Sequence, residues 1–594
     1  MAETDTMLKG VKAPPEIFSI DAEVQALRRQ KLTCGTRIGK FFQYHWKGVV
    51  VLLLPILFSP LLFIETQYVK EYRCLYILLV MSFFWLTEVL PLPVTSMIPI
   101  VAFPVAGIMS SEATCALYFK DTLVMFIGGI MMALAVEHCN LHKRLALRVI
   151  QIVGCSPRRL HFGLVIVTMF ISLWINNAAA TAMMCPIIQA VLEQLEAQGM
   201  CKLHRDDVKK SDDEPPYPSK ITMCFYMGTA YAATMGGCGT IIGTATNLTF
   251  KGIYDGKFPN AKDSIDFATF MFYSVPPMLI YTFLMYLYMQ WAYMGLFRPN
   301  SKEAKEVNLG DAGAQVARKV IDEKYEQLGP MSCHEFSVMI AFILMILLYF
   351  TRHPGIFTGW DSLFESEIKN ASPTLLVVIL CFILPANYAF LKWCSKSTDV
   401  PNKTINSLHS WKFIQQKVPW GLIFLLGGGF ALAKGTEVSK LDKLLGQGLK
   451  GLKGLHPLVL LLVVILFAEF ATEFSSNVAM CNIIVPVLIE MCLAIEIHPL
   501  YLVLPAGLAC SMAFHLPVAT PPNAIVASFA NIRTKDMIIC GIGPSLITIV
   551  VLFISCQTWG LVIYPNLMDG LPDWIERVNQ TIAQTALANN TLHL

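Results

Sequence analysis

The chain has 594 residues, of which 55% are hydrophobic and 15% are charged, with a net charge of +3. Soluble domains carry about 25% charged residues, so this composition and a mean hydropathy of +0.56 exclude a soluble globular protein. They predict an all-α polytopic membrane protein that sits in a lipid bilayer. The small net charge gives no reason to expect binding to nucleic acid. The cysteines lie mostly in apolar runs without metal-ligand spacing, so we expect small buried side chains and no metal centre or cofactor.

Residues 1–45 are polar and basic and contain no signal peptide, so we expect a cytoplasmic N-terminal segment. Because a span needs about 20 residues, the apolar segments that follow predict about 11 transmembrane helices. These segments lie near 46–64, 74–90, 93–108, 122–137, 221–250, 268–296, 335–352, 373–391, 420–436, 499–531 and 536–564. We predict a first repeat over 46–298, a cytoplasmic loop over 299–334, a second, inverted repeat over 335–565 and an extracellular tail over 566–594.

Two further apolar runs are long enough to cross twice, and each has a polar break near its middle. They cover 160–196 and 457–497, with the breaks at Asn176-Asn177 and Ser476-Asn477. A proline follows the second asparagine of each break after nine positions, at Pro186 and Pro486. We predict two re-entrant hairpins that enter the membrane from opposite sides.

A second polar break follows in each half, Thr244 to Asn247 and Thr520 to Asn523. Non-helical backbone at membrane depth is tolerated only beside protein or a water-filled cavity, and paired interrupted helices point to a transporter's binding site. We therefore predict a substrate-binding site made of Asn176, Asn177, Thr181, Thr244, Asn247, Ser476, Asn477, Thr520, Pro522 and Asn523.

Topology follows from the distribution of basic residues. The loops assigned to the inside carry clusters of lysine and arginine, as the positive-inside rule expects. Eleven crossings from a cytoplasmic N-terminus then put the C-terminus outside the cell. We expect the protein to lie in the plasma membrane. Sequons at Asn579 and Asn589 predict a glycosylated tail, and Asn370 begins another sequon in a predicted outer loop.

Three segments identify a family resemblance: WLTEVLPLPVTSMIPIVAFPVAGI (85–108), ATAMMCPI (180–187) and LPVATPPNAIV (516–526). They resemble the divalent anion/sodium symporter family, the sodium-dicarboxylate, citrate and sulfate carriers, and the similarity extends over nearly the whole chain after residue 46. The resemblance implies a homodimer in which each protomer has a scaffold and a mobile transport domain that holds both hairpin tips. It also implies elevator-type alternating access.

The chain departs from the family at both tips. The family has Ser-Asn-Thr there, whereas this chain has Asn176-Asn177-Ala178 and Ser476-Asn477-Val478, so only one of the four hydroxyls remains. Hard cations prefer oxygen ligands. We therefore predict absent or weak sodium dependence, with anion exchange or proton coupling. The alternative is a sodium-coupled symporter of dicarboxylates, citrate or sulfate, with carbonyls of these residues holding the cation: Gly236, Gly237, Gly239, Thr240, Gly243 and Ala519.

Neither tip contains a lysine or arginine. We therefore expect helix N-termini, which carry partial positive charge, to balance part of the charge of a bound anion. His515 stands where the family usually has an apolar residue. An imidazole near the Thr520 break can exchange protons near neutral pH, and we predict a role in proton or charge coupling. The alternative for His515 is a structural hydrogen bond to a carbonyl. Glu469 and Glu473, one helical turn apart, fit a paired face.

These features predict a carrier of di- and tricarboxylates such as succinate and citrate. A channel would need a continuous polar path, and the apolar segments show no regular stripe of charge or hydroxyls. An enzyme would need a nucleophile or metal motif, and neither H-E-x-x-H nor G-x-S-x-G is present in the sequence.

Overall fold

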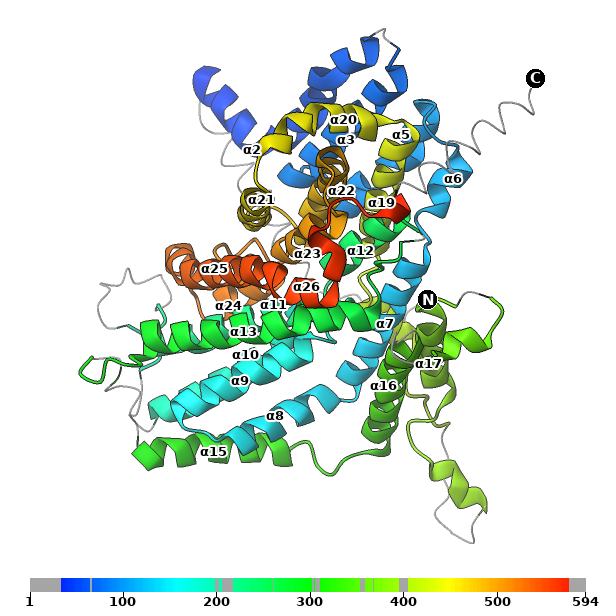
Figure 1. The fold of residues 1–594 in the computed structure, drawn as a ribbon. Coiled ribbons are helices and arrows are strands. Elements are labelled where there is room, and N and C mark those ends of the chain that lie inside the picture. Colours follow the sequence, from blue (N-terminus) through cyan, green and yellow to red (C-terminus); the bar gives the residue numbers. More distant parts are fainter. Residues whose placement is uncertain are drawn as a thin grey trace, which may run out of the picture. The chain divides into compact units, whose positions relative to one another are not determined.

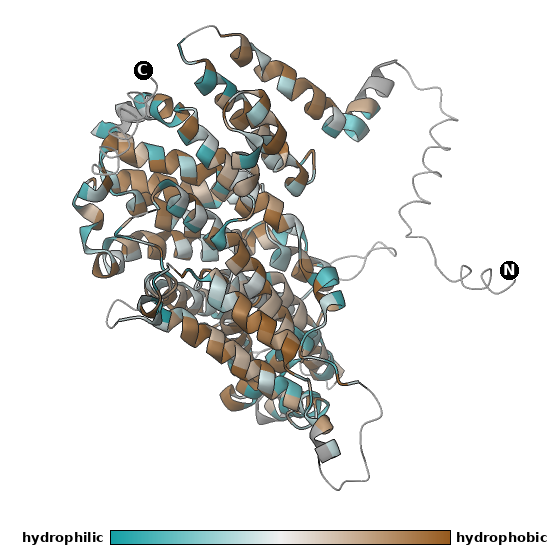
Figure 2. Cartoon of the chain, turned by 90° about the vertical axis from the view of Figure 1, so that its right-hand side faces the viewer, coloured by the Kyte–Doolittle hydropathy of each residue, from teal (hydrophilic) through white to brown (hydrophobic). Residues whose placement is uncertain are grey.

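The computed structural model describes residues 34–64, 67–197, 202–205, 217–259, 261–301, 304, 310–352, 358–366, 368–394 and 404–575. Within these ranges the regular elements are helices, with two isolated β-bridges besides. Eight of the described helices are long and apolar enough to cross a membrane, and four shorter helices are also apolar. Figure 2 shows the hydrophobic stretches along them. The sequon residues Asn579 and Asn589 lie outside the described residues.

The chain divides into two compact units, Met1–Ser59 and Pro60–Leu594. In the first unit, α2 (Cys34–Phe58) has non-helical backbone angles at His45 and contains Pro55. Its apolar side chains, including Leu52 and Leu57, are exposed. That exposure suits a helix surrounded by lipid.

The second unit begins with the helices of the predicted first repeat. Their bounds are η1 (Ser59–Phe63), α3 (Val69–Thr87), α4 (Leu92–Thr95), α5 (Ile98–Val105), α6 (Ser111–Ala116), α7 (Asp121–His138), α8 (Leu141–Val153), α9 (Pro157–Ser172), α10 (Asn177–Ala197), α11 (Lys220–Gly237), α12 (Ala245–Lys257) and α13 (Phe267–Met294). The helices α9 and α10 pack against each other and against α11 (Figure 1).

The chain then continues through a linker and the predicted second repeat. The bounds are α15 (Gly310–Glu326), α16 (Cys333–Arg352), η2 (Trp360–Leu363), α17 (Ala371–Ile383), η3 (Ala389–Cys394), α18 (Trp411–Lys417), α19 (Gly421–Val438), α20 (Leu441–Leu449), η4 (Lys450–Gly454), α21 (Pro457–Thr472), α22 (Asn477–Ile495), α23 (Pro499–Ala509), α24 (Pro521–Phe529), α25 (Thr534–Gln557), α26 (Trp559–Ile563) and η5 (Pro565–Met568). The helices α19, α20, α21 and α22 each begin 300 residues after α7, α8, α9 and α10.

Two of the eleven predicted spans are interrupted in the part of the chain that the structure describes. The apolar segments 221–250 and 499–531 are each divided, the first between α11 and α12 and the second between α23 and α24. The sequence stays apolar across both breaks, so composition alone did not show where one helix ends and the next begins. Each break ends at a threonine, because Thr244 and Thr520 are the N-caps of the helices that follow.

The predicted loop 299–334 contains a helix of 17 residues, α15. Its side chains at Ala317, Val320 and Ile321 are buried, which is the spacing of one helical face. This face packs against α8 and α10, and Figure 1 shows α8 between α9 and α15. The linker between the halves is thus part of the packed unit.

A buried ion pair fixes this linker to the first half. Nη2 of Arg144 in α8 lies 3.2 Å from Oε1 of Glu335 in α16, with side chains 9% and 5% exposed. The guanidinium also donates to the carbonyl oxygens of Leu328, Gly329 and Pro330. Removing one member of such a pair leaves a buried charge uncompensated, at a cost of about 3–5 kcal/mol.

We therefore expect Arg144→Met to lower the apparent melting temperature of the purified protein by several degrees. Arg148→Met is the matched control, because Arg148 lies on the same helix and donates to Gln151 at an exposed position. Thermal denaturation in detergent compares the two variants. Equal melting temperatures for both would show that the ion pair contributes no net stability.

Candidate functional site

Each predicted hairpin consists of two helices separated by a short tip. The first has α9 and α10 around residues 173–176, and the second has α21 and α22 around 473–476. Pro186 and Pro486 lie inside α10 and α22. Each tip is therefore a break immediately before a helix N-terminus, where backbone N–H groups lack intrahelical partners.

The asparagines that begin α10 and α22 are held in the same way. Oγ of Ser172 lies 2.6 Å from Oδ1 of Asn177 and 2.7 Å from the carbonyl oxygen of Ala233. Thr472 Oγ1 lies 2.7 Å from Oδ1 of Asn477 and 2.7 Å from the carbonyl oxygen of Cys510. The hydroxyl at the end of the first helix of each hairpin lies within hydrogen-bond distance of both oxygens, and its single proton can be donated to one of them at a time.

The other tip residues have different partners. Asn176 is exposed, and its Oδ1 accepts from the backbone N–H of Ala178 at 2.9 Å. Thr181 is fully buried, and its hydroxyl donates to the carbonyl oxygen of Asn177 at 2.9 Å. Ser476 is the N-cap residue of α22 and makes no capping bond with its side chain.

The second breaks place threonine at the start of a helix in both halves. Thr244 is the N-cap of α12, and its hydroxyl accepts from the backbone N–H of Thr246 at 3.0 Å. Thr520 is the N-cap of α24 and is buried, and its hydroxyl has no hydrogen-bond partner among the described residues. Thr520 thus combines an unsatisfied buried hydroxyl with a position at the start of a helix.

The paired asparagines of the second breaks brace the backbone. Nδ2 of Asn247 donates to the carbonyl oxygens of Gly237 and Thr240, at 3.2 and 2.7 Å. Nδ2 of Asn523 donates to the carbonyl oxygens of Ala513 and Leu516, at 3.2 and 3.1 Å. Both side chains are fully buried. These hydrogen bonds therefore stabilise the non-helical backbone of each break.

Both tips and both second breaks meet at one cavity of about 570 Å³, which we call the tip cavity. Its lining includes nine of the residues predicted for the substrate or cation site: Asn176, Asn177, Gly243, Thr244, Ser476, Asn477, Ala519, Thr520 and Pro522. Seven predicted residues do not line it: Thr181, Gly236, Gly237, Gly239, Thr240, Asn247 and Asn523. The N-termini of α10, α12, α22 and α24 all border this cavity, and each favours negative charge.

Sequence reasoning missed several lining residues, and these include the ionisable Glu137 and Lys417, the aromatic Trp174 and the exposed Val518. Lys417 ends α18, a short helix outside the predicted spans. Trp174 and Val518 are next to the predicted breaks in the chain, whereas Glu137 and Lys417 come to the cavity through packing of more distant segments.

The glycines that precede Thr244 allow close packing, because their positions leave no room for a side chain. A Cβ atom on Gly237 would collide with the amide of Asn177, and one on Gly236 would collide with the backbone of Met169. The hydroxyl of Thr240 donates to the carbonyl oxygen of Leu173 and accepts from the backbone N–H of Gly243. The loop thus lets α11 approach the first hairpin tip closely.

His515 does not line the cavity; it is paired with Glu473. Its Nδ1 lies 2.9 Å from Oε1 of Glu473, which is in the second hairpin tip. The structural alternative for His515, a hydrogen bond to a carbonyl, is therefore not what the structure has. The partner is a carboxylate, so the pair is ionic whenever the imidazole is protonated.

Asn370 is a poor glycosylation acceptor in this structure. It is the N-cap of α17, and only 5% of it is exposed. A glycan needs an accessible amide nitrogen, and little of this side chain is exposed, but glycosylation at Asn370 stays a prediction. The sequon is in a packed helix start, where burial is not visible from the sequence.

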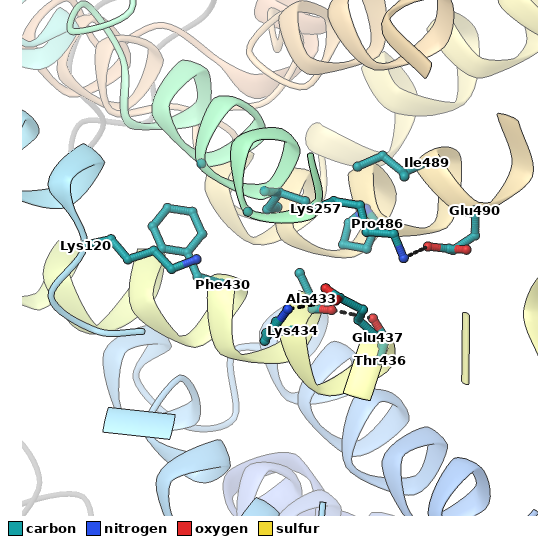
Figure 3. A pocket seen from close by; sticks show the side chains of 13 residues that line it. Lys120, Lys257, Phe430, Ala433, Lys434, Thr436, Glu437, Pro486, Ile489 and Glu490 are labelled. Atoms are coloured by element: carbon teal, nitrogen blue, oxygen red, sulfur yellow. Dashed lines mark hydrogen bonds and ion pairs between the residues drawn. The ribbon is translucent and has the colours of Figure 1, made fainter. Parts of the chain in front are cut away.

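A second, smaller cavity lies between α12, α19 and α22 (Figure 3). Its volume is about 20 Å³, which is enough for a water molecule. Its charges are largely paired: Lys257 lies 2.8 Å from Glu490 and Lys434 lies 2.7 Å from Glu437. Its lining shares no residue with the tip cavity. Of these two cavities, the tip cavity is the one with room for a substrate of several carbon atoms.

Interrupted helices that meet at a cavity in a multi-pass membrane protein define the class of secondary transporters. The comparisons with known proteins agree. The chain matches the family described as sodium:sulfate symporter transmembrane region over residues 43–565. The chain belongs to this family, and the resemblance expected from its sequence segments is confirmed.

Similarity to individual relatives extends over almost the whole chain. It is 62% identical to the protein I'm not dead yet of Drosophila melanogaster, over 99% of this chain and 100% of the fly protein. It is 36% identical to Na(+)/dicarboxylate cotransporter 3 of Rattus norvegicus, over 92% of this chain and 97% of that one. For the Na(+)/citrate cotransporter of Rattus norvegicus the identity is 35%, over 91% and 98%. The chain is a multi-pass membrane transport protein and not an enzyme.

Proposed function

We propose that this protein carries di- and tricarboxylates such as succinate and citrate across the plasma membrane. The observation that carries the proposal is the meeting of two asparagine tips and two threonine-capped breaks at one cavity. Four helix N-termini border that cavity, and unpaired N–H groups and asparagine amides are donors suited to carboxylates. The names of the rat relatives, which specify dicarboxylate and citrate, support this substrate class.

The substrate would contact Asn176, Asn177, Thr244, Ser476, Asn477, Thr520 and Pro522 directly. Thr181, Asn247 and Asn523 then act from behind, through the backbone carbonyls that they bond. A substrate of several carbon atoms fits a cavity of about 570 Å³ with room for water. Each tip offers the amide nitrogen of its asparagine, because Oδ1 faces the hydroxyl of Ser172 or Thr472.

Transport is proposed to be independent of sodium or only weakly dependent on it. Ala178 and Val478 replace hydroxyl residues at the tips, which removes oxygen ligands that a sodium ion would use. At the first tip, the Oδ1 of Asn176 is engaged with a backbone N–H. Anion exchange or proton coupling, with His515 contributing charge, then balances the substrate. The second candidate is a sodium-coupled symporter of carboxylates or sulfate that uses carbonyls of residues 236–243 and Ala519.

The proposed architecture is a homodimer of inverted repeats that moves its binding site by an elevator mechanism, with a cytoplasmic N-terminus and an extracellular C-terminus. The equal spacing of α7–α10 and α19–α22 supports a duplicated origin of the halves. The two hairpins then belong to the mobile transport domain.

Uptake of radiolabelled succinate and citrate, with sodium replaced by choline, tests this proposal. We expect full uptake without sodium and faster uptake when the cells are preloaded with citrate. Uptake that is lost on sodium removal would instead support the sodium-coupled candidate. Absence of carboxylate uptake in either medium, with the protein present at the cell surface, would refute carboxylate transport.

A further inference from the structure

The carboxylate of Glu473 is a centre of hydrogen bonds at the second hairpin tip. Its Oε1 accepts from the backbone N–H of Phe514 at 2.6 Å and from Nδ1 of His515 at 2.9 Å. Its Oε2 accepts from the backbone N–H groups of His515 and Leu516, at 3.1 and 3.2 Å. The side chain of Glu473 is only 7% exposed, and that of His515 is 25% exposed.

These bonds fix the second break of the second half. Residues 510–520 are not helical, so their backbone N–H groups need partners outside the helix ladder. Successive backbone N–H groups form a concave site for an anion, and Glu473 fills it. The break continues into Val518, Ala519 and Thr520, which line the tip cavity. Glu473 thus connects the second hairpin tip to the second break, part of which lines the cavity.

The first half has no such charge. Leu173 occupies the position that follows α9, as Glu473 follows α21. There the hydroxyl of Thr240 bonds the carbonyl oxygen of Leu173, and the leucine side chain packs against Gly239. The first break is therefore held by a hydroxyl and an apolar side chain, and the second by the carboxyl group of Glu473.

We propose that Glu473 is a positioning residue that makes His515 a proton-binding group of the transport cycle. Bonded through Nδ1 to Glu473, the imidazole has Nε2 left to take up a proton. Protonation adds one positive charge beside the cavity wall and favours an anionic substrate. This inference rests on the proposed carboxylate transport and deepens it, because it names the pair that would compensate substrate charge.

Polar groups on α11, α21 and α25 also lie near this pair. Glu469, one turn earlier on α21, accepts from the hydroxyl of Thr548 on α25 at 2.7 Å. Ser545 Oγ on α25 lies 3.5 Å from His515 Nδ1. On α11, the hydroxyl of Tyr231 donates to the carbonyl oxygen of Phe514 at 3.2 Å. Of these groups, Glu473 is the one with a direct ionic contact to the imidazole.

The test measures KM and maximal uptake of labelled fumarate at about pH 6 to 8, a range that spans histidine titration while fumarate stays fully ionised. The variants are His515→Gln, Glu473→Gln and the double substitution. Glu437→Gln is the control, since Glu437 pairs with Lys434 outside the tip cavity. We expect the wild-type KM to fall by about threefold to tenfold towards low pH and the KM of His515→Gln to be independent of pH.

Glu473→Gln removes the charge that favours the imidazolium, so the midpoint of its KM profile should move to lower pH by about one unit. The double variant should behave as His515→Gln does, because both changes act on one proton. A purely structural role would lower maximal uptake without moving the midpoint. If Glu473→Gln does not reach the cell surface, Glu473→Asp is measured in its place. This variant keeps the carboxylate, so its KM should still depend on pH.

A wild-type pH profile in His515→Gln, or an unmoved midpoint in Glu473→Gln, would overturn the inference. The proposed function has a separate failure, which is the absence of wild-type carboxylate uptake at every pH. The two outcomes are therefore distinguishable in one experiment.

Discussion

Replacing Asn477 with alanine is expected to reduce uptake of labelled succinate and citrate by about 10- to 100-fold, and replacing Asn177 should do the same. Each amide lies at a hairpin tip and lines the cavity, with Oδ1 held by a hydroxyl. The amide nitrogen can then donate to a substrate carboxylate. A hydrogen bond to a charged group contributes about 1.5–3 kcal/mol, which corresponds to that range of affinity.

The measurement is initial uptake over a range of substrate concentrations, with surface protein quantified by biotinylation. Asn566→Ala is the matched control, because Asn566 is exposed in η5 and is absent from the lining of the tip cavity. We expect wild-type uptake from this control. Normal uptake in Asn177→Ala or Asn477→Ala would remove that residue from the substrate site.

Gly237→Ala is expected to reduce uptake about as strongly as Asn177→Ala, although Gly237 does not line the cavity. A Cβ atom at this position would overlap the amide of Asn177, so the amide must move out of its bonded position. Overpacking of this kind costs about 1–3 kcal/mol. The loss should therefore come from a displaced donor and not from a missing one.

Gly163→Ala is the matched control for this prediction. Its added methyl group would meet Val153 at 3.6 Å, an ordinary van der Waals contact, and we expect normal uptake. The double variant Gly237→Ala with Asn177→Ala should be no worse than Asn177→Ala alone, because both changes disable the same amide. Additive losses of uptake, with equal surface protein, would instead assign Gly237 a separate role.

Several features of the protein were determined by local sequence. The helical class follows from long apolar runs, and the hairpin tips follow from polar residues that interrupt those runs. The spacing of Asn177 to Pro186 and of Asn477 to Pro486 recurs, and this duplication was visible without a structure. Such features depend on residues next to one another in the chain, so a pattern search can find them.

The orientation of the polar residues was decided by tertiary structure. Thr244 and Asn247 belong to one break, yet Thr244 lines the cavity while Asn247 turns away to bond the carbonyl oxygens behind it. Sequence reasoning assigned both to the substrate. An asparagine in an apolar run must satisfy its amide somewhere, but the sequence does not show whether the partner is a ligand or the protein.

Long-range pairing was also beyond the sequence. Glu473 and Glu469 were interpreted together as one paired face, but the structure joins Glu473 to His515 and Glu469 to Thr548. Lys417 likewise reaches the cavity from a short helix outside the predicted spans. The sequence determined where the chain breaks, because breaks are local. Packing of distant helices decided which side chains face the cavity, because that direction depends on neighbours far away in the chain.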